Sequence, residues 1–208
     1  MTSINNLKKE LASAAKIKES WERAVAISAI IAETLRTIHQ DPILVGGTAV
    51  EFYTQGAYST ADIDMITEGG PELVRLMSEL GFKKYGKDFA HPHLKIYIEF
   101  PGHSLGDSEK DKIIKIGKRY LRIISIEDLI VDRLAAFKFW KSAIDGVNAL
   151  LLLELGEADL ARVEQRTKEE EVDDAFMAVQ EVLEAVIRKK LPRNEANQLL
   201  KQKMRSLK

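Results

Sequence analysis

The segment between residues 43 and 66 constrains the fold more than any other part of the chain. It starts with an apolar run, Ile43–Val45, that reads as a short buried strand. The pair Gly46-Gly47 follows, and glycines let the backbone turn and approach a ligand closely. Thr48–Tyr53 suits a helix that starts at those glycines, so that its free N–H groups face the same place. The segment therefore predicts a strand, a glycine turn and a helix, followed by a second strand.

The second strand of this segment, predicted over Ser59–Ile66, carries two acids in alternation. Residues i and i+2 of a strand share one face, so Asp62 and Asp64 are expected to project together, with Ile63 and Met65 buried behind them. Two neighbouring carboxylates repel each other unless a cation lies between them. Magnesium prefers carboxylate oxygens and retains waters for a phosphate-bearing substrate. The alternation therefore predicts a metal site.

Composition excludes several classes of function. The chain has 208 residues, of which 45% are hydrophobic, and a net charge of -1, so there is no global attraction to nucleic acid. It contains no cysteine, which excludes disulfides, thiolate zinc sites and cysteine nucleophiles and agrees with an expected cytoplasmic location. Apolar runs such as Ala149–Leu153 are far shorter than the roughly 20 residues that span a bilayer, so no membrane partner is expected.

Periodicity divides the chain into two parts. Helical spacing is found over residues 4–17, 21–38 and 71–80, hairpin signals over 82–90 and 112–124, and strand alternation over 94–100. From residue 125 onward only helical patterns occur. We therefore expect an α+β fold, with an α/β domain over residues 1–124 that includes the N-terminal helices and a helical region over 125–208. The large aromatic residues are expected in the core rather than on a base-stacking surface: Trp21, Phe137, Phe139 and Trp140.

The order strand, Gly-Gly, helix and Asp-x-Asp strand resembles the DNA polymerase beta-like nucleotidyltransferase superfamily. The matching residues are Gly46-Gly47 and Asp62-Ile63-Asp64. In that superfamily a third acid on a later strand, usually Asp, completes the site, and Glu99 occupies a fitting place here. The resemblance implies a mixed sheet with flanking helices and a helical C-terminal part.

Within the superfamily, Gly46–Ala49 and Ser59–Asp64 are similar to bacterial AbiEii-type and related nucleotidyltransferases. These often carry an Arg shortly before the first Asp. In this chain Tyr58 lies near that position, and no Arg does. They also tend to have a Glu-Asp-Leu motif, basic residues and a later Asp in the following helices. Similar residues here are Glu127, Asp128, Leu129, Arg133, Lys138 and Asp145. This branch implies an enzyme of the toxin–antitoxin type.

The resemblance implies magnesium-dependent transfer of a nucleotide, such as that of ATP, from an NTP to an acceptor that the sequence does not identify. The acceptor is RNA such as tRNA, a protein or a small molecule. In this interpretation Asp62, Asp64 and Glu99 hold two magnesium ions, which stabilise the attacking and leaving oxygens. Glu99 also helps to take the proton of the acceptor.

The same resemblance assigns the contacts to the nucleotide. Gly46, Gly47 and Thr48 are expected to contact the triphosphate through backbone N–H groups and a hydroxyl. Arg133 and Lys138, on the following helix, are candidates for neutralising the triphosphate charge. These two residues can also be ordinary surface charges, because no acid lies three or four positions away.

Other interpretations of the Asp-x-Asp pattern stay open. Haloacid-type phosphatases usually have Thr or Val two positions after the second Asp, where this chain has Ile66. Glycosyltransferases with this motif usually have longer chains. Glu99 can also be an exposed strand residue beside Lys95. An alternative of another class is a non-catalytic scaffold or antitoxin-like partner that keeps the fold without the chemistry.

Overall fold

The structure, a computed structural model, describes residues 3–207. These residues fall into two compact units, the first ending at Ser125 and the second beginning at Ile126. The first unit contains the sheet and the second contains helices only. Each unit is described by itself below.

The first unit contains the helices α1 (Ile4–Ala14), α2 (Ser20–Arg36), α3 (Gly46–Tyr53) and α4 (Pro71–Leu80). The sequence contains residues typical of helix ends at both ends of α4. Pro71 occupies the first turn of α4, and Gly81 ends this helix with a left-handed φ of 102°. Helix α3 starts at Gly46, so it begins at the glycine pair, where the sequence pattern predicts its start.

The strands are β1 (Ile43–Leu44), β2 (Asp62–Ile66), β3 (Lys83–Tyr85), β4 (Asp88–His91), β5 (Ile96–Glu99), β6 (Asp111–Ile116) and β7 (Arg119–Ile124). Over the described residues they form one seven-stranded sheet in the order β3-β4-β5-β2-β1-β7-β6. The pairs β1–β7 and β2–β5 are parallel and the other pairs are antiparallel. The expected α+β class is therefore confirmed.

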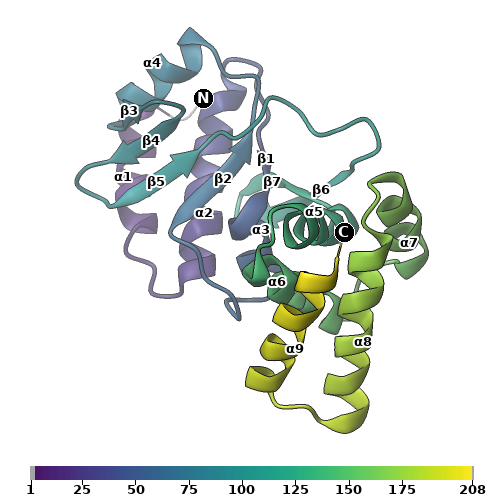
Figure 1. Cartoon of the computed structure of the whole chain (residues 1–208). Coiled ribbons are helices and arrows are strands. Elements are labelled where there is room, and N and C mark those ends of the chain that lie inside the picture. Colours follow the sequence, from purple (N-terminus) through teal and green to yellow (C-terminus); the bar gives the residue numbers. More distant parts are fainter. Residues whose placement is uncertain (1–2, 208) are drawn as a thin grey trace. The chain divides into compact units, whose positions relative to one another are not determined.

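One face of the sheet forms the core of this unit. Helix α2 lies behind β2 in Figure 1 and contacts β2 and β7. Ile63, Met65 and Ile98 point to this buried side, with exposed fractions of at most 5%. Because side chains alternate along a strand, the neighbouring residues of β2 and β5 point to the opposite face. That opposite face carries the acids.

Strands β2 and β5 begin later than the sequence pattern predicts. Strand β2 begins at Asp62 instead of Ser59, because the Thr60 N–H donates to the Glu51 side chain at 3.3 Å and not to a neighbouring strand. Strand β5 begins at Ile96 because Lys95 has a left-handed φ of 54°, which interrupts extended backbone.

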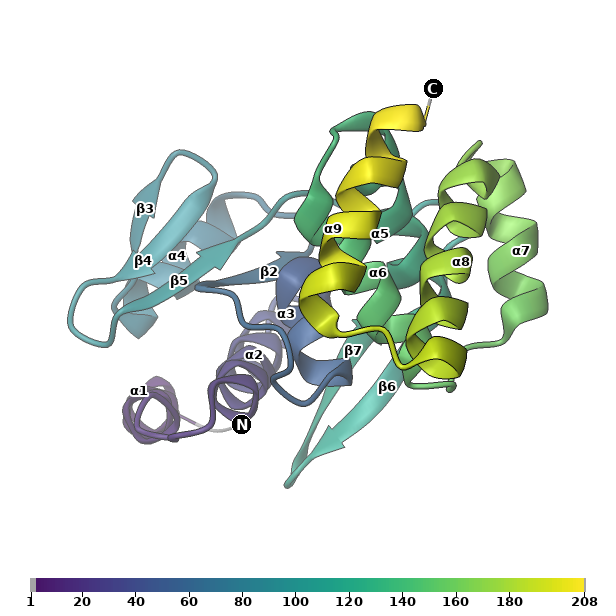
Figure 2. The same cartoon turned by 60° about the horizontal axis from the view of Figure 1, so that its bottom comes forward.

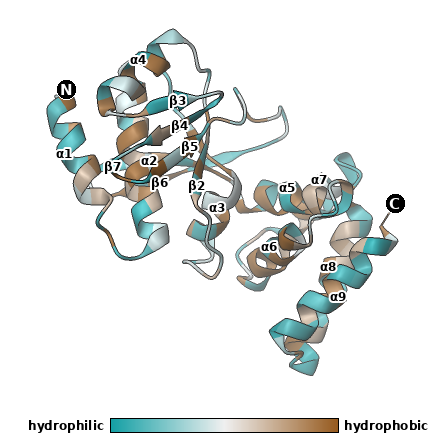
Figure 3. Cartoon of the chain, turned by 60° about the vertical axis from the view of Figure 1, so that its left-hand side comes forward, coloured by the Kyte–Doolittle hydropathy of each residue, from teal (hydrophilic) through white to brown (hydrophobic). Residues whose placement is uncertain are grey.

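The second unit contains α5 (Ile126–Phe139), α6 (Ala143–Glu154), α7 (Leu160–Glu169), α8 (Asp173–Lys189) and α9 (Arg193–Ser206). Helices α8 and α9 run side by side (Figure 2), and α6 is apolar along most of its length (Figure 3). Helices α5 and α6 pack closely at Gly146. A Cβ at this position would lie 3.1 Å from Cγ of Phe137. This unit therefore has a core of its own.

A buried charge network joins α5 to α7. The carboxylate of Asp128 is fully buried and accepts from Arg162 Nη2 at 2.5 Å and from Arg166 Nε at 3.0 Å. Burial lowers the pKa of Arg166, but the hydrogen bonds that its guanidinium donates to Glu169, Asp128 and Glu170 outweigh this effect and raise the pKa. Asp128 is thus bonded within the second unit.

The expected burial of two aromatic residues is wrong. Phe137 is fully buried, but Phe139 and Trp140 are 54% and 84% exposed. Helix α5 ends at Phe139, so both side chains lie at or beyond its last turn, outside the packed part of the helix. Within residues 3–207, no helix combines the length and the apolar character needed to cross a membrane.

Candidate active site

Acids from three strands line up on the open face of the sheet. In the parallel pair β2–β5, Asp62 is opposite Tyr97 and Asp64 is opposite Glu99. In the antiparallel pair β4–β5, Asp88 is opposite Glu99. Residues opposite each other share a face, and neighbouring strands lie about 4.8 Å apart. Asp64, Glu99 and Asp88 therefore form a row across the sheet, with Asp62 one step away along β2.

The start of α3 holds the carboxylate of Asp64. The Gly47 N–H donates to Asp64 Oδ2 at 3.0 Å, and the positive end of a helix dipole favours a carboxylate there. Gly46 has a φ of 61°, and a Cβ at this position would lie 2.8 Å from Cβ of Asp64. Only glycine leaves room for this approach. The glycine pair and the second Asp, predicted to belong to one site, are in direct contact.

Thr48 acts on the backbone of the acidic strand. Its side chain is 1% exposed, and its hydroxyl donates to the carbonyl oxygen of Asp62 at 2.7 Å. This hydroxyl therefore anchors the first residue of β2, whereas the resemblance implies a contact with a triphosphate. The helix start fixes both aspartates, one through its carboxylate and one through its backbone.

A lysine that no sequence motif indicates lies among the acids. Lys87, in the turn between β3 and β4, forms an ion pair with Glu99 and is itself 63% exposed. The hydrogen bond to Glu99 is the largest cause that raises the pKa of Lys87, and the charges of Asp88 and Asp64 raise it further. Among residues 3–207, no three His, Asp or Glu side chains are grouped so that they could hold a metal ion. Glu99 and Asp64 are each turned to a partner of their own.

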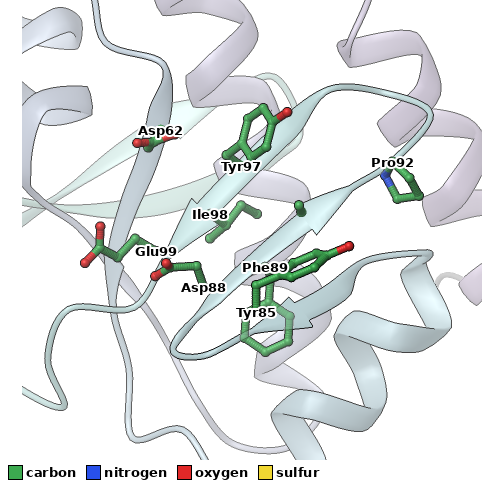
Figure 4. Close-up of a pocket in the computed structure, with 9 residues that line it drawn as sticks. Asp62, Tyr85, Asp88, Phe89, Pro92, Tyr97, Ile98 and Glu99 are labelled. Atoms are coloured by element: carbon green, nitrogen blue, oxygen red, sulfur yellow. The ribbon is translucent and has the colours of Figure 1, made fainter.

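A cavity of about 460 Å³ opens over these strands (Figure 4). The carboxylates of Glu99 and Asp88 lie at one end of it, and Asp62 lies on the neighbouring strand. Two rings, Tyr85 and Tyr97, are 61% and 50% exposed. The lining residues are Asp62, Tyr85, Asp88, Phe89, Ala90, Pro92, Tyr97, Ile98 and Glu99. The cavity thus combines carboxylates with aromatic surface.

The two basic candidates are neutralised by acids of the second unit. Arg133 Nη1 and Nη2 donate to Asp145 at 2.7 Å and to Asp132 at 2.5 Å. Burial lowers the pKa of Arg133, but the charges and hydrogen bonds of these two acids outweigh it and raise the pKa. Lys138 Nζ lies 2.9 Å from Asp174 Oδ1. Both cations therefore have ion-pair partners, although no acid lies three or four positions away in the sequence.

Sequence reasoning misses Lys87 and Asp88 as members of the site. Both belong to the hairpin formed by β3 and β4, and their proximity to Glu99 follows from the register of β4 on β5. A one-residue change in register would turn Asp88 to the other face. The signal that could identify Tyr97 is simpler, because it lies two residues before Glu99 on the same face.

No protein-family model matches this sequence, and no curated protein sequence matches it. Among solved structures, the chain is similar to an antigenic nucleotidyltransferase-like protein from Paracoccidioides brasiliensis, with a TM-score of 0.51 and 12% sequence identity. The match covers 93% of each chain. At this identity the likeness is one of fold, and the fold of this chain is nucleotidyltransferase-like.

Proposed function

We propose that this protein transfers a nucleotide from an NTP to an acceptor and that the reaction depends on magnesium. The observation that carries the proposal is the contact of the Gly46-Gly47 helix start with Asp64. Asp62 and Glu99 lie on the same face of the sheet as this carboxylate. The nucleotidyltransferase-like fold supports the same reaction class.

The donor set fits a hard divalent cation in ligand type, although among the described residues these carboxylates are not grouped around one point. Asp62, Asp64 and Glu99 offer carboxylate oxygens from neighbouring strands, and these are the ligands that magnesium prefers. Glu99 is paired with Lys87, so this residue would exchange an ammonium for a metal ion when the site is loaded. Bound magnesium supplies positive charge that stabilises the attacking and leaving oxygens of the phosphoryl group.

The protein residues contribute positioning and proton transfer. The acceptor hydroxyl oxygen forms a bond to the α-phosphorus, the bond from this phosphorus to the pyrophosphate oxygen breaks, and Glu99 takes the hydroxyl proton. Gly47 orients the carboxylate of Asp64 through its N–H, and Thr48 fixes the backbone of Asp62. Lys87, once separated from Glu99, offers its ammonium to the phosphates.

The proposed branch of the superfamily rests on the sequence pattern. Gly46–Ala49 and Ser59–Asp64 support a place in the AbiEii-type branch and an enzyme of the toxin–antitoxin type. ATP is the first nucleotide to test. RNA, protein and small molecules are the acceptor classes to compare. In the same proposal, Arg133 and Lys138 stay candidates for neutralising the triphosphate. The triphosphate would compete for them with their ion-pair partners, Asp145 and Asp174.

A labelling experiment tests the proposal. Each α-labelled NTP is incubated with magnesium, the full chain and separate cellular fractions of RNA, protein and small molecules. We expect the variant with Asp62→Asn and Asp64→Asn to lose at least about a thousandfold in rate, because loss of these ligands costs several kcal/mol of barrier at about 1.4 kcal/mol per tenfold. The exposed loop variant Asp107→Asn is the control and should label as the wild type does. Undiminished labelling by the double variant would remove these aspartates from the mechanism.

A non-catalytic scaffold is the second candidate. It is favoured by the absence of an assembled group of three metal ligands within the described residues. It is also favoured by the pairing of Glu99 with Lys87. In this case the wild-type chain labels no fraction with any NTP, and the double aspartate variant behaves identically.

A further inference from the structure

A second cavity, of about 310 Å³, lies at the start of strands β2 and β5 in the first unit. Asp62 and Tyr97 line this cavity as well as the one over the acids. A molecule in the second cavity would therefore lie against a residue of the proposed catalytic site. The lining residues are Ala15, Ser20, Arg23, Ala24, Ile27, Glu51, Thr60, Ala61, Asp62, Ile63, Leu94, Lys95, Ile96 and Tyr97.

Glu51, on α3, lines this cavity and carries an unsatisfied carboxylate oxygen. Glu51 is 1% exposed. Oε2 accepts the Thr60 N–H at 3.3 Å, whereas Oε1 has no hydrogen-bond partner among the described residues. Buried polar atoms are almost always paired, because an unpaired one loses its hydration without compensation. A donor group on a ligand would supply the missing partner.

Cations line the same cavity. Arg23 is held in place because its Nη1 donates to the carbonyl oxygens of Ile17 and Lys18, at 2.7 and 3.2 Å. Lys95 contributes an exposed ammonium from the turn before β5. The cavity therefore presents one buried acceptor atom and two positive charges, with the carboxylate of Asp62 as a further acidic group in its lining. This combination suits a molecule with both a donor group and an anionic group.

We propose that this second cavity binds the acceptor of the nucleotidyl transfer, and that the acceptor is a small hydroxy or amino carboxylic acid. The inference rests on the proposed function. Glu51 is a positioning residue that accepts a hydrogen bond from the O–H or N–H of the acceptor. Arg23 and Lys95 attract its carboxylate. The volume suits a small molecule, since ligand pockets start at about 300 Å³.

The Thr60 amide is a direct reporter, because its N–H donates to Glu51. We expect a panel of L-serine, L-threonine and glycerate to shift the Thr60 amide signal in ¹H–¹⁵N spectra of the full chain. Propionate, which lacks the donor, and ethanolamine, which lacks the carboxylate, should bind at least tenfold more weakly. Glu51→Gln should weaken panel binding tenfold or more, and Glu22→Gln, at an exposed position of α2, should not. The absence of any shift at tens of millimolar would overturn the inference.

Two further measurements separate this inference from the proposed function. Lys95→Met changes an exposed residue, so it tests the cationic mouth even if a substitution at Glu51 impairs folding; unchanged panel binding would count against the inference. The second measurement is calorimetry with MgATP on the wild type and on Glu51→Gln. Equal MgATP binding by both chains, with panel binding only by the wild type, supports the acceptor site and the proposed function. Panel binding without MgATP binding overturns the proposed function and, with it, the role as acceptor site. MgATP binding without panel binding overturns the inference alone.

Discussion

The ammonium group of Lys87 determines how much negative charge the open face of the sheet carries. It is paired with Glu99, and Asp88 and Asp64 are close enough to raise its pKa. A metal ion at Glu99 must therefore compete with an attached cation. In this account Lys87 balances the acids when no metal is bound.

The substitution Lys87→Met tests this balance. Removing a positive charge beside carboxylates should strengthen the binding of Mg²⁺ alone, by no more than about fivefold, since solvent screens an exposed ion pair. Calorimetry with MgCl₂ measures the change. The matched control is Lys84→Met on β3, whose register partner is Phe89 and not an acid. Equal or weaker magnesium binding by the Lys87 variant would show that this lysine does not compete for the site.

For single residues, the sequence predicts only the face of the strand to which each side chain points, because this depends on local alternation. Asp62 and Asp64 lie on one face with Ile63 and Met65 buried behind them, as strand periodicity requires. The partners of these acids could not be predicted, because they depend on contacts between strands. Lys87 reaches Glu99 only through the hairpin register.

Helix α3 is the element that organises the site. Its first turn bonds the carboxylate of Asp64 through Gly47, and it anchors the backbone of Asp62 through Thr48. The same helix carries Glu51, which holds the segment before β2 through Thr60. One short helix thus positions the acidic strand at three points. The Gly-Gly pair predicts this helix start, whereas the bonds of the Gly47 N–H to Asp64 and of the Thr48 hydroxyl to Asp62 are contacts within the fold.

The substitution Gly46→Ala tests the close approach of α3 and β2. A left-handed φ of 61° disfavours alanine, and its Cβ would overlap the side chain of Asp64. We expect the free energy of unfolding to fall by about 2–4 kcal/mol, from backbone strain plus overpacking. Chemical denaturation measures it. Gly69→Ala is the control, since Gly69 also has a positive φ, 81°, but an added Cβ meets nothing within 4 Å. Equal losses for both variants would mean that the contact with Asp64 is not tight.

Element types follow from periodicity, but several boundaries do not. The left-handed backbone at Lys95 shortens β5, and no residue type there signals it. The end of α5 leaves Phe139 and Trp140 exposed although both are aromatic. Side-chain type alone does not report where packing against a neighbouring element stops.

At the scale of the whole molecule, the first unit combines a mixed sheet with helices and the second has a helical core of its own. The strand order β3-β4-β5-β2-β1-β7-β6 could not be predicted from alternation, because it places β2 beside β5 and β1 beside β7 through long connections. The pairs Arg133–Asp145 and Lys138–Asp174 likewise join different helices. Their partners are distant in sequence, so helical spacing does not reveal them.

The central claim is that a glycine-started helix and neighbouring carboxylates form a site for a metal–triphosphate. Calorimetric titration of the full chain with ATP, with and without Mg²⁺, tests it most directly. The account predicts that the wild type binds ATP only with Mg²⁺ and that the variant with Asp62→Asn and Asp64→Asn loses this binding while its thermal unfolding stays cooperative. Binding of ATP that is independent of Mg²⁺, or that is retained by the folded double variant, would contradict it.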